Sequence, residues 1–347
     1  MCRNSDNGCI WAAAIRDCRE RSDTLFHACV ACQAYLSHGP SESFLKFYEQ
    51  LLTSVQSDLH YPYQQLNDGT LGATVLLCTI GMLQGVPWTI HLKGMKAIFD
   101  VYDQLPPSIN PGPLFSHCLG IMGVFDLERL NVGRTTTCLN IWQRYRKEKF
   151  GRSNNEIDGI EIISGLPRSL IDVFAVEVSA SAEEALWLWP GYEGSITQCH
   201  LWESYRLAGV LDIRHRRKEK IGNDVERADR RMSNVSNDDV LRRGLSALDA
   251  IYNGREMAAY VVDKSRPRIH TLFPLFIMTL EVISAHQHRS WHPLLESWIT
   301  IEAALDQTSN TRLAWQIIED MIESLKMGFQ YTPDQIAKMR GIEVLLL

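Results

Sequence analysis

Two aspartates near residue 100 have the spacing of paired metal ligands. Asp100 and Asp103 are separated by two residues, and residues three apart lie on the same face of a helix. Two carboxylates on one face can bind the same cation, because Mg²⁺ prefers oxygen ligands. The sequence therefore suggests Asp100 and Asp103 as metal ligands. The alternative is an acidic helix end that precedes the proline-rich segment 105–113.

A second group of polar residues begins at Asn223. Asn223 and Asp224 offer further oxygen ligands, and Arg227, Arg230 and Arg231 follow within a few residues. A guanidinium can bind two phosphate oxygens at once. We therefore predict that Asn223 and Asp224 bind a metal ion and that the three arginines contact a phosphorylated substrate.

Aromatic side chains are concentrated just before this group. Trp187, Trp189, Tyr192, Trp202 and Tyr205 fall within nineteen residues. Aromatic faces attract cations, by about 2 kcal/mol or more when the contact excludes water. Trp187, Trp189 and Tyr192 are therefore candidates for the wall of a catalytic pocket. The alternative is ordinary core packing, which is the commoner role of aromatic residues at helical spacing.

The stretch from Arg214 to Arg243 differs in composition from the rest of the chain, with ten basic and six acidic residues. One interpretation is a cationic lid, at about residues 214–240, that closes over an anionic ligand. The other is a solvated linker between two helical halves. Residues 237–239 (Asn-Asp-Asp) are similarly open to two interpretations, as a second metal site or as the cap of the following helix.

The overall composition limits the function classes. The chain has 347 residues, of which 45% are hydrophobic and 22% charged, so it is a globular protein rather than a disordered one. Its net charge of −6 excludes a globally basic nucleic-acid binder. The apolar run 271–280 contains Pro274 and is too short to span a bilayer. We expect no membrane span and no direct nucleic-acid contact.

The cysteines indicate a reducing compartment. There are nine, an odd number at mixed spacings, which favours free thiols over a disulfide framework. The N-terminus is polar and lacks the apolar region of a secretory signal. We therefore expect a cytoplasmic protein, and the sequence leaves a homodimer open.

Nearly every segment of the chain has helical periodicity. Apolar residues between Phe44 and Val55 recur at spacings of three and four, which predicts an amphipathic helix. Residues 71–83 are apolar nearly all round and predict a buried helix. Further helices are predicted at 88–102, 114–130, 136–149, 167–188, 196–213, 240–262, 271–288, 293–305, 311–327 and 333–342. These elements favour an all-α fold, with residues 1–347 as one large helical domain that encloses a central pocket.

Several stretches resemble the fungal-specific transcription factor domain, the helical regulatory region that normally follows a binuclear zinc cluster. The most specific are His91-Leu92-Lys93-Gly94 and residues 272–276 (LFPLF). The other matching stretches are residues 28–36, 71–78, 88–90, 125–127, 133–134 and 165–170. The resemblance implies an all-α fold, in agreement with the periodicity.

One departure from the family pattern bears on function. The zinc cluster needs six cysteines in a fixed spacing, and here only Cys29 and Cys32 have the inner spacing, within an apolar helix. We therefore expect no zinc cluster, and we interpret these two cysteines as core packing.

The resemblance leaves two functions open. Stand-alone chains of this type resemble humulene-type sesquiterpene cyclases, which implies a class I reaction that converts farnesyl diphosphate, a prenyl diphosphate, into a humulene-like hydrocarbon with Mg²⁺ as cofactor. In that hypothesis the aspartates, Asn223 and the arginines named above hold the metal and the diphosphate. The alternative is a nuclear transcriptional regulator or ligand-binding regulatory domain without its own DNA-binding module.

Overall fold

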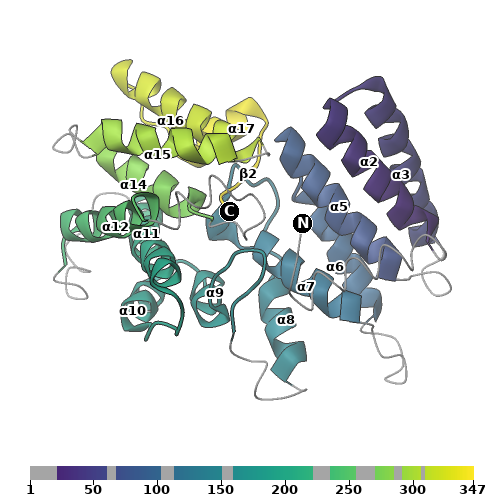
Figure 1. The fold of residues 1–347 in the computed structure, drawn as a ribbon, viewed down its shortest axis with the longest axis horizontal. Helices are drawn as coiled ribbons and strands as arrows, with labels where there is room; N and C mark the ends of the chain where they lie inside the picture. Colours follow the sequence, from purple (N-terminus) through teal and green to yellow (C-terminus); the bar gives the residue numbers. More distant parts are fainter. Residues whose placement is uncertain are drawn as a thin grey trace.

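The computed structural model describes residues 22–60, 68–102, 113–150, 159–221, 235–254, 270–284, 291–305 and 309–347. Helices dominate this part of the chain (Figure 1), so the predicted all-α fold is confirmed. The α-helices are α2 (Asp23–His38), α3 (Glu42–His60), α5 (Asp68–Gln84), α6 (Ile90–Tyr102), α7 (Pro113–Phe125), α8 (Ile141–Phe150), α9 (Arg168–Phe174), α10 (Ala180–Leu188), α11 (Ile196–Ile221), α12 (Asn237–Tyr252), α14 (Leu272–Ser284), α15 (His292–Leu305), α16 (Asn310–Lys326) and α17 (Pro333–Arg340).

The helix α5 joins two hydrophobic clusters. Leu71 and Val75 belong to the main core, whereas Leu77 and Ile80 pack into a smaller cluster with α2 and α3. Figure 1 shows α2 and α3 together at one edge of the molecule, beside α5. A helix that packs on two sides must be apolar nearly all round, which explains the composition of residues 71–83.

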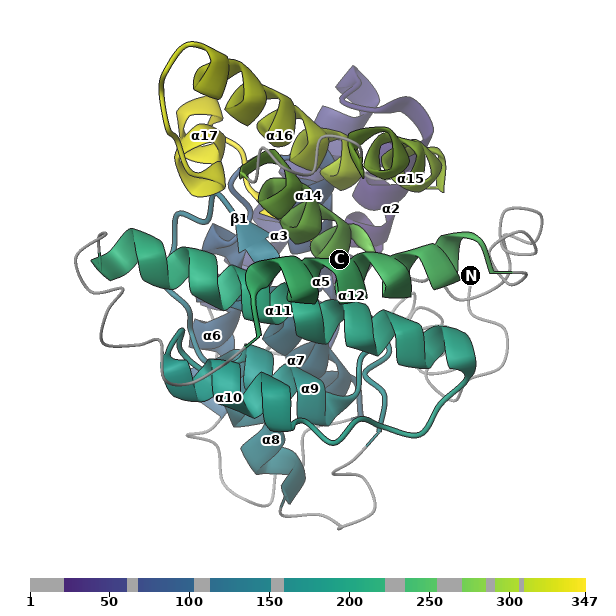
Figure 2. The same cartoon turned by 90° about the vertical axis from the view of Figure 1, so that its left-hand side faces the viewer.

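The centre of the second half is a pair of neighbouring helices, α11 and α12, covered by α14. Figure 2 shows α11 and α12 crossing the molecule, with α10 below and α14 above. Trp202 and Tyr205 of α11 are buried in the main core, and the Tyr205 ring stacks on Phe273 at 5.5 Å. Two of the five clustered aromatic residues therefore pack as core.

The C-terminal segment packs against residues from earlier parts of the chain. Strand β2 (Val344–Leu345) pairs antiparallel with β1 (Asn131–Val132), a short sheet that the sequence did not predict. The buried carboxylate of Glu343 accepts hydrogen bonds from the backbone and side chains of Thr89 and Thr135. Residues more than 200 positions apart are thus fixed together.

Several predicted helix boundaries are wrong. The helix predicted at 136–149 begins only at Ile141, and the one predicted at 240–262 begins at Asn237 and ends at Tyr252. The segment predicted as one helix at 167–188 is two helices, because Ser179 caps the start of α10 by accepting a hydrogen bond from the Ala182 amide. α11 continues past residue 213 to Ile221. The helix predicted at 114–130 ends at Phe125, because the Asn131 side chain bonds the carbonyls of Phe125 and Leu127 and holds a 3₁₀ turn at Glu128–Leu130.

Candidate functional site

The structure describes one of the four predicted metal ligands. Asp100 lies near the end of α6, and its carboxylate accepts hydrogen bonds from Lys96 at 2.6 Å and from Arg144 of α8 at 3.2 Å. The carboxylate therefore faces two cations and ties α6 to α8. Asp103, Asn223 and Asp224 lie outside the described residues, so the magnesium site stays a prediction. Within the described residues, no three His, Cys, Asp or Glu side chains form a group suited to a metal ion.

The predicted substrate-binding arginines, Arg227, Arg230 and Arg231, also lie outside the described residues. Two of the basic side chains that precede them on α11, Arg214 and Arg217, are paired. Arg214 donates to Glu183 at 2.8 Å and also to Asn237 at 2.7 Å. Arg217 is 3.4 Å from Glu183. These pairs fasten α11 to α10 and to the start of α12, so this part of the charged segment is structural.

The three predicted wall residues occupy separate, half-buried positions at the edge of the main core. The Trp187 ring has the guanidiniums of Arg206 and Arg243 at 5.4 and 5.9 Å from its centre. The Trp189 indole donates a hydrogen bond to Ser169 at 3.1 Å. The Tyr192 ring meets Trp202 edge to face, at 5.9 Å.

Two smaller interpretations can also be checked. The cap of α12 is Ser236, whose hydroxyl accepts a hydrogen bond from the Asp239 amide, so Asn237 is the first residue of the helix. Cys29 and Cys32 are half-buried on α2 with free thiols. Burial raises the pKa of both thiols, which suits the packing role rather than a reactive one.

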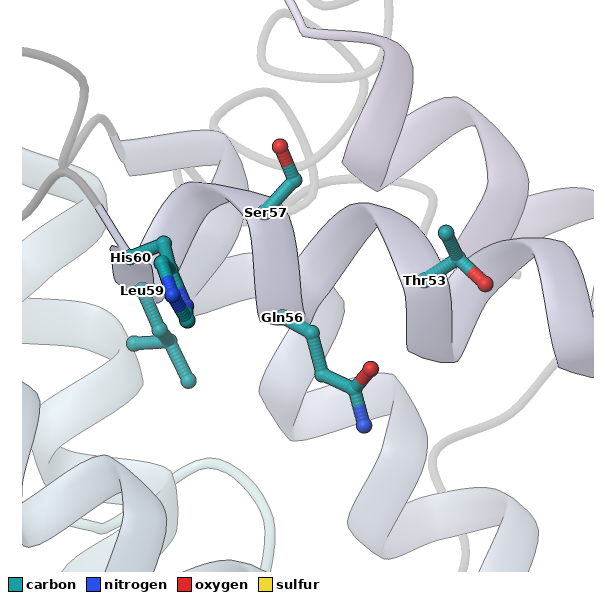
Figure 3. Close-up of a pocket in the computed structure, with 5 residues that line it drawn as sticks. All are labelled: Thr53, Gln56, Ser57, Leu59 and His60. Carbon is teal, nitrogen blue, oxygen red and sulfur yellow. The ribbon is translucent and has the colours of Figure 1, made fainter.

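A hollow along α3 has a volume of about 570 Å³ (Figure 3). Thr53, Gln56, Ser57, Leu59 and His60 line it, and all five come from the same helix. In Figure 3 the side chains of Thr53, Gln56 and Ser57 point in different directions. Side chains that do not converge on one point do not form a binding site, so we place no function here.

A cleft of about 310 Å³ has the features of a binding site. It opens between α7 and α8 on one side and α9 and α11 on the other. In Figure 1, α9 lies between α8 and α11, and α11 is at the left of the molecule. Its lining includes apolar side chains, carboxylates and two arginines, from residues as far apart as Gly123 and Glu219. We call it the Arg129 cleft, after its most buried arginine.

Arg129 is only 2% exposed, and the 3₁₀ turn after α7 points it toward α11. Its Nε donates to Asp212 at 2.8 Å and its Nη2 donates to the Gly209 carbonyl at 2.6 Å. Its third nitrogen, Nη1, is buried and has no hydrogen-bond partner among the described residues. Burial lowers the pKa of the Arg129 guanidinium, and Asp212 opposes that shift.

A second arginine completes the buried ionic group. Arg216, one turn after Asp212 on α11, donates to the other Asp212 oxygen at 2.7 Å. Asp212 thus bridges two guanidiniums. Burial by itself would raise the pKa of Asp212, but Arg216 and Arg129 outweigh it, so the pKa is lowered. Arg129 and Arg216 both line the cleft, and two arginines against one aspartate leave one positive charge.

Asp126 fixes the position of the loop before α8, which forms another wall of the cleft. This buried carboxylate accepts hydrogen bonds from Arg134 and from the amides of Leu139 and Ile141. It fixes the loop before α8, where Asn140 has a φ of 57°, a conformation that is uncommon for residues other than glycine. Asn140 also lines the cleft. The loop is therefore set in one conformation by a buried anion.

Sequence patterns could not identify this cleft. Its residues belong to no spaced motif, and Arg129 and Asp212 are 83 positions apart. The available signal was the match of residues 125–127 and 133–134 to the family pattern, which flank Arg129 on both sides.

Comparison with known families gives one match. The family model described as "Fungal specific transcription factor domain" matches residues 6–187, a segment that includes α2 to α9, Arg129 and all of α10 except Leu188. No curated protein and no solved structure matches the chain. In the described residues, none of the helices combines the length and apolar character needed to cross a membrane.

Proposed function

Because this chain belongs to the family of fungal specific transcription factor domains, we propose that it is a transcriptional regulator whose output depends on a small molecule bound in the Arg129 cleft. The observation that carries the proposal is the ionic group at the cleft, in which the single carboxylate of Asp212 pairs with both Arg129 and Arg216, and Arg216 is 20% exposed. Hydrogen bonds between a guanidinium and an anionic group are stronger than those between neutral groups. A ligand whose anionic group paired with Arg216 would gain affinity from this contact.

The position of the cleft supports a regulatory role. A ligand there would contact α7 and α8 as well as α9 and α11. A molecule that binds two groups of elements stabilises the arrangement in which both contacts are made. Ligand binding would therefore favour one packing of these helices and change the surface that a partner protein meets.

A tethered reporter tests the proposal. The chain is fused to a DNA-binding module from another protein, and transcription from the matching promoter is measured in a fungal host grown in rich and in minimal medium. We expect an output that differs from that of the module alone and that changes between media. We also expect a fluorescently tagged chain to enter the nucleus. Output equal to that of the module alone in every medium would refute the regulatory role.

The sesquiterpene cyclase is the second candidate. It is favoured by Trp187, whose ring attracts the guanidiniums of Arg206 and Arg243, because a cyclase pocket needs aromatic faces that stabilise cations. In this reading the protein is cytoplasmic and uses Mg²⁺. The test is incubation of the purified chain with farnesyl diphosphate and Mg²⁺. A humulene-like hydrocarbon with release of diphosphate would support the cyclase, and the absence of both products would exclude it.

A further inference from the structure

The charges around the Arg129 cleft are not uniform. On its inner side, Arg129 and Arg216 share the single carboxylate of Asp212, which leaves one positive charge, and Arg216 is the more exposed of the two arginines, at 20%. This side therefore suits the anionic end of a ligand. Gly209 allows the arrangement, because a Cβ at this position would come within 3.1 Å of both Arg129 Nη2 and the Phe174 ring.

The other charged residues of the cleft are acidic. Glu128, Glu177 and Glu219 come from the 3₁₀ turn, the α9–α10 loop and the end of α11, and all three are exposed. No hydrogen bond or ion pair joins these carboxylates to another described side chain. Burial raises the pKa of Glu219, with further upward contributions from Asp334 and Asp212 that Arg216 and His215 oppose. The rim of the cleft is therefore negative.

This pattern excludes ligands that carry only negative charge. A phosphate or a dicarboxylate bound beside Arg129 would lie close to three carboxylates, and like charges at short distance repel. A simple amine would be attracted by the rim but would offer no anionic group to the Arg216 guanidinium. Only a ligand with both an anionic and a cationic group satisfies the two sides together.

The size and the apolar wall of the cleft restrict the ligand further. A volume of about 310 Å³ is at the lower end of the range of ligand pockets, about 300–1,000 Å³. Trp142, Phe174 and Leu127 contribute buried apolar surface, and Val176 and Val178 contribute more at the mouth. The Trp142 indole nitrogen is already bonded to Asp172 at 2.7 Å, so the wall suits a small apolar side chain.

We infer that the Arg129 cleft binds a small zwitterion, an α-amino acid with an apolar side chain. Its carboxylate pairs with the Arg216 guanidinium, and its ammonium lies among Glu128, Glu177 and Glu219. The apolar side chain lies against Trp142 and Val176. This inference rests on the proposed function and names the ligand class of the same site.

Calorimetric titration of the full chain tests the ligand class. The probes are L-leucine and L-phenylalanine, together with analogues that lack one charge each: 4-methylpentanoate and 3-phenylpropanoate without the ammonium, and 3-methylbutylamine and 2-phenylethylamine without the carboxylate. We expect at least one amino acid to bind about tenfold or more tightly than both of its analogues, a difference of about 1.4 kcal/mol. Equal binding of the carboxylate analogue, or no binding of either amino acid, would overturn the inference.

Two variants connect the binding to the cleft. Glu177→Gln removes one exposed rim carboxylate and should weaken binding of the amino acid several-fold, while the carboxylate analogue, which that carboxylate repels, should bind as tightly as before or more tightly. Glu184→Gln, an exposed residue of α10 outside the cleft, is the matched control and should leave both affinities unchanged. Equal affinity of Glu177→Gln and the wild type for the amino acid would also overturn the inference. The tethered reporter measures regulation independently, so a regulator with a different ligand is distinguished from a protein that is not a regulator.

Discussion

At the scale of single residues, the most unusual feature is the buried group of Arg129, Asp212 and Arg216. One carboxylate bridges two guanidiniums, and the side chains of Arg129 and Asp212 are 2% and 3% exposed. Removing charges from water is costly unless each charge finds partners. Three hydrogen bonds pair five atoms of the group, including both Asp212 oxygens. Arg216 is 20% exposed, which makes it the cation of the group that a ligand can reach.

Replacing Arg129 should lower stability. Arg129→Gln removes two hydrogen bonds and one of the two cations beside Asp212. Loss of one partner of a buried ion pair costs about 3–5 kcal/mol, and we expect about 3 kcal/mol because Arg216 still pairs with Asp212. The free energy of unfolding in urea measures the loss. Arg340→Gln, which breaks an ion pair with Asp320 at the surface, is the control and should cost no more than about 1 kcal/mol. Equal losses for the two variants would contradict the account.

Low pH should weaken the ionic group of Arg129, Asp212 and Arg216. The pKa of Asp212 is lowered in the folded protein, so its stabilising effect is complete above the ordinary pKa of about 3.9 and is lost as the pH falls through the folded value. We expect the free energy of unfolding to decrease below about pH 4. In Asp212→Asn this decrease should be smaller. Asp249→Asn, on the exposed side of α12, should keep the pH dependence of the wild type, and an unchanged slope in Asp212→Asn would argue against the assignment.

The sequence alone predicted some of the roles of these residues. Trp202 and Tyr205 pack as core, which was the alternative interpretation of the aromatic stretch. Asp100 has the predicted helical position, but the sequence could not show that Arg144 would reach it from another helix. Arg129 was missed for the same physical reason, since ionic partners far apart in sequence leave no periodic signal.

At the scale of elements, hydrophobic spacing predicted most helices because each buries one side. It failed where polar side chains set the boundaries. Asn131 ends α7 and forms the turn that carries Arg129, and Ser179 separates α10 from α9. Both side chains act on backbone groups near them, an effect that apolar spacing does not register. Each of these boundaries contributes to the Arg129 cleft.

The residue that follows β1, Gly133, packs against α17 and gives a test at this scale. Gly133 has a φ of +79°, and a Cβ there would be 2.4 Å from the Ile342 carbonyl oxygen and 2.5 Å from the Ala337 Cβ. Gly133→Ala should therefore destabilise the protein by more than about 1–3 kcal/mol. Gly94→Ala, in α6 with no described heavy atom within 4 Å of the new Cβ, should instead stabilise it by about 0.5–1 kcal/mol. Thermal unfolding of both variants measures the difference, and a shift of the same sign in both would contradict the structure.

At the scale of the whole molecule, the C-terminal segment connects distant parts of the chain. Glu343 bonds Thr89 and Thr135, and the Leu346 amide bonds the Leu130 carbonyl at 2.8 Å. The second of these contacts lies directly beside Arg129 in the chain. The C-terminus therefore supports the turn that positions Arg129, and its effect should extend to the Arg129 cleft.

Weakening these contacts of the C-terminal segment should lower both the stability of the protein and its affinity for the ligand. Glu343→Gln turns one acceptor oxygen into a donor that faces existing donors, which should cost about 1–3 kcal/mol. Urea unfolding measures the stability, and titration with the amino acid that binds the wild type measures the affinity. Glu323→Gln on α16, an exposed residue, should change neither. A Glu343→Gln variant as stable as the wild type would show that the contacts of Glu343 are not required for stability.

The most direct test of the central claim is to fill the Arg129 cleft without touching its charges. Val176→Trp places a large side chain at the mouth of the cleft, where Val176 is 48% exposed, and Val86→Trp is the control at a position 42% exposed outside the cleft. Melting temperatures are measured first to establish that both variants fold. In the tethered reporter, we predict that the response to the growth medium is lost in Val176→Trp and retained in Val86→Trp. A full response in a folded Val176→Trp protein would contradict control through the cleft.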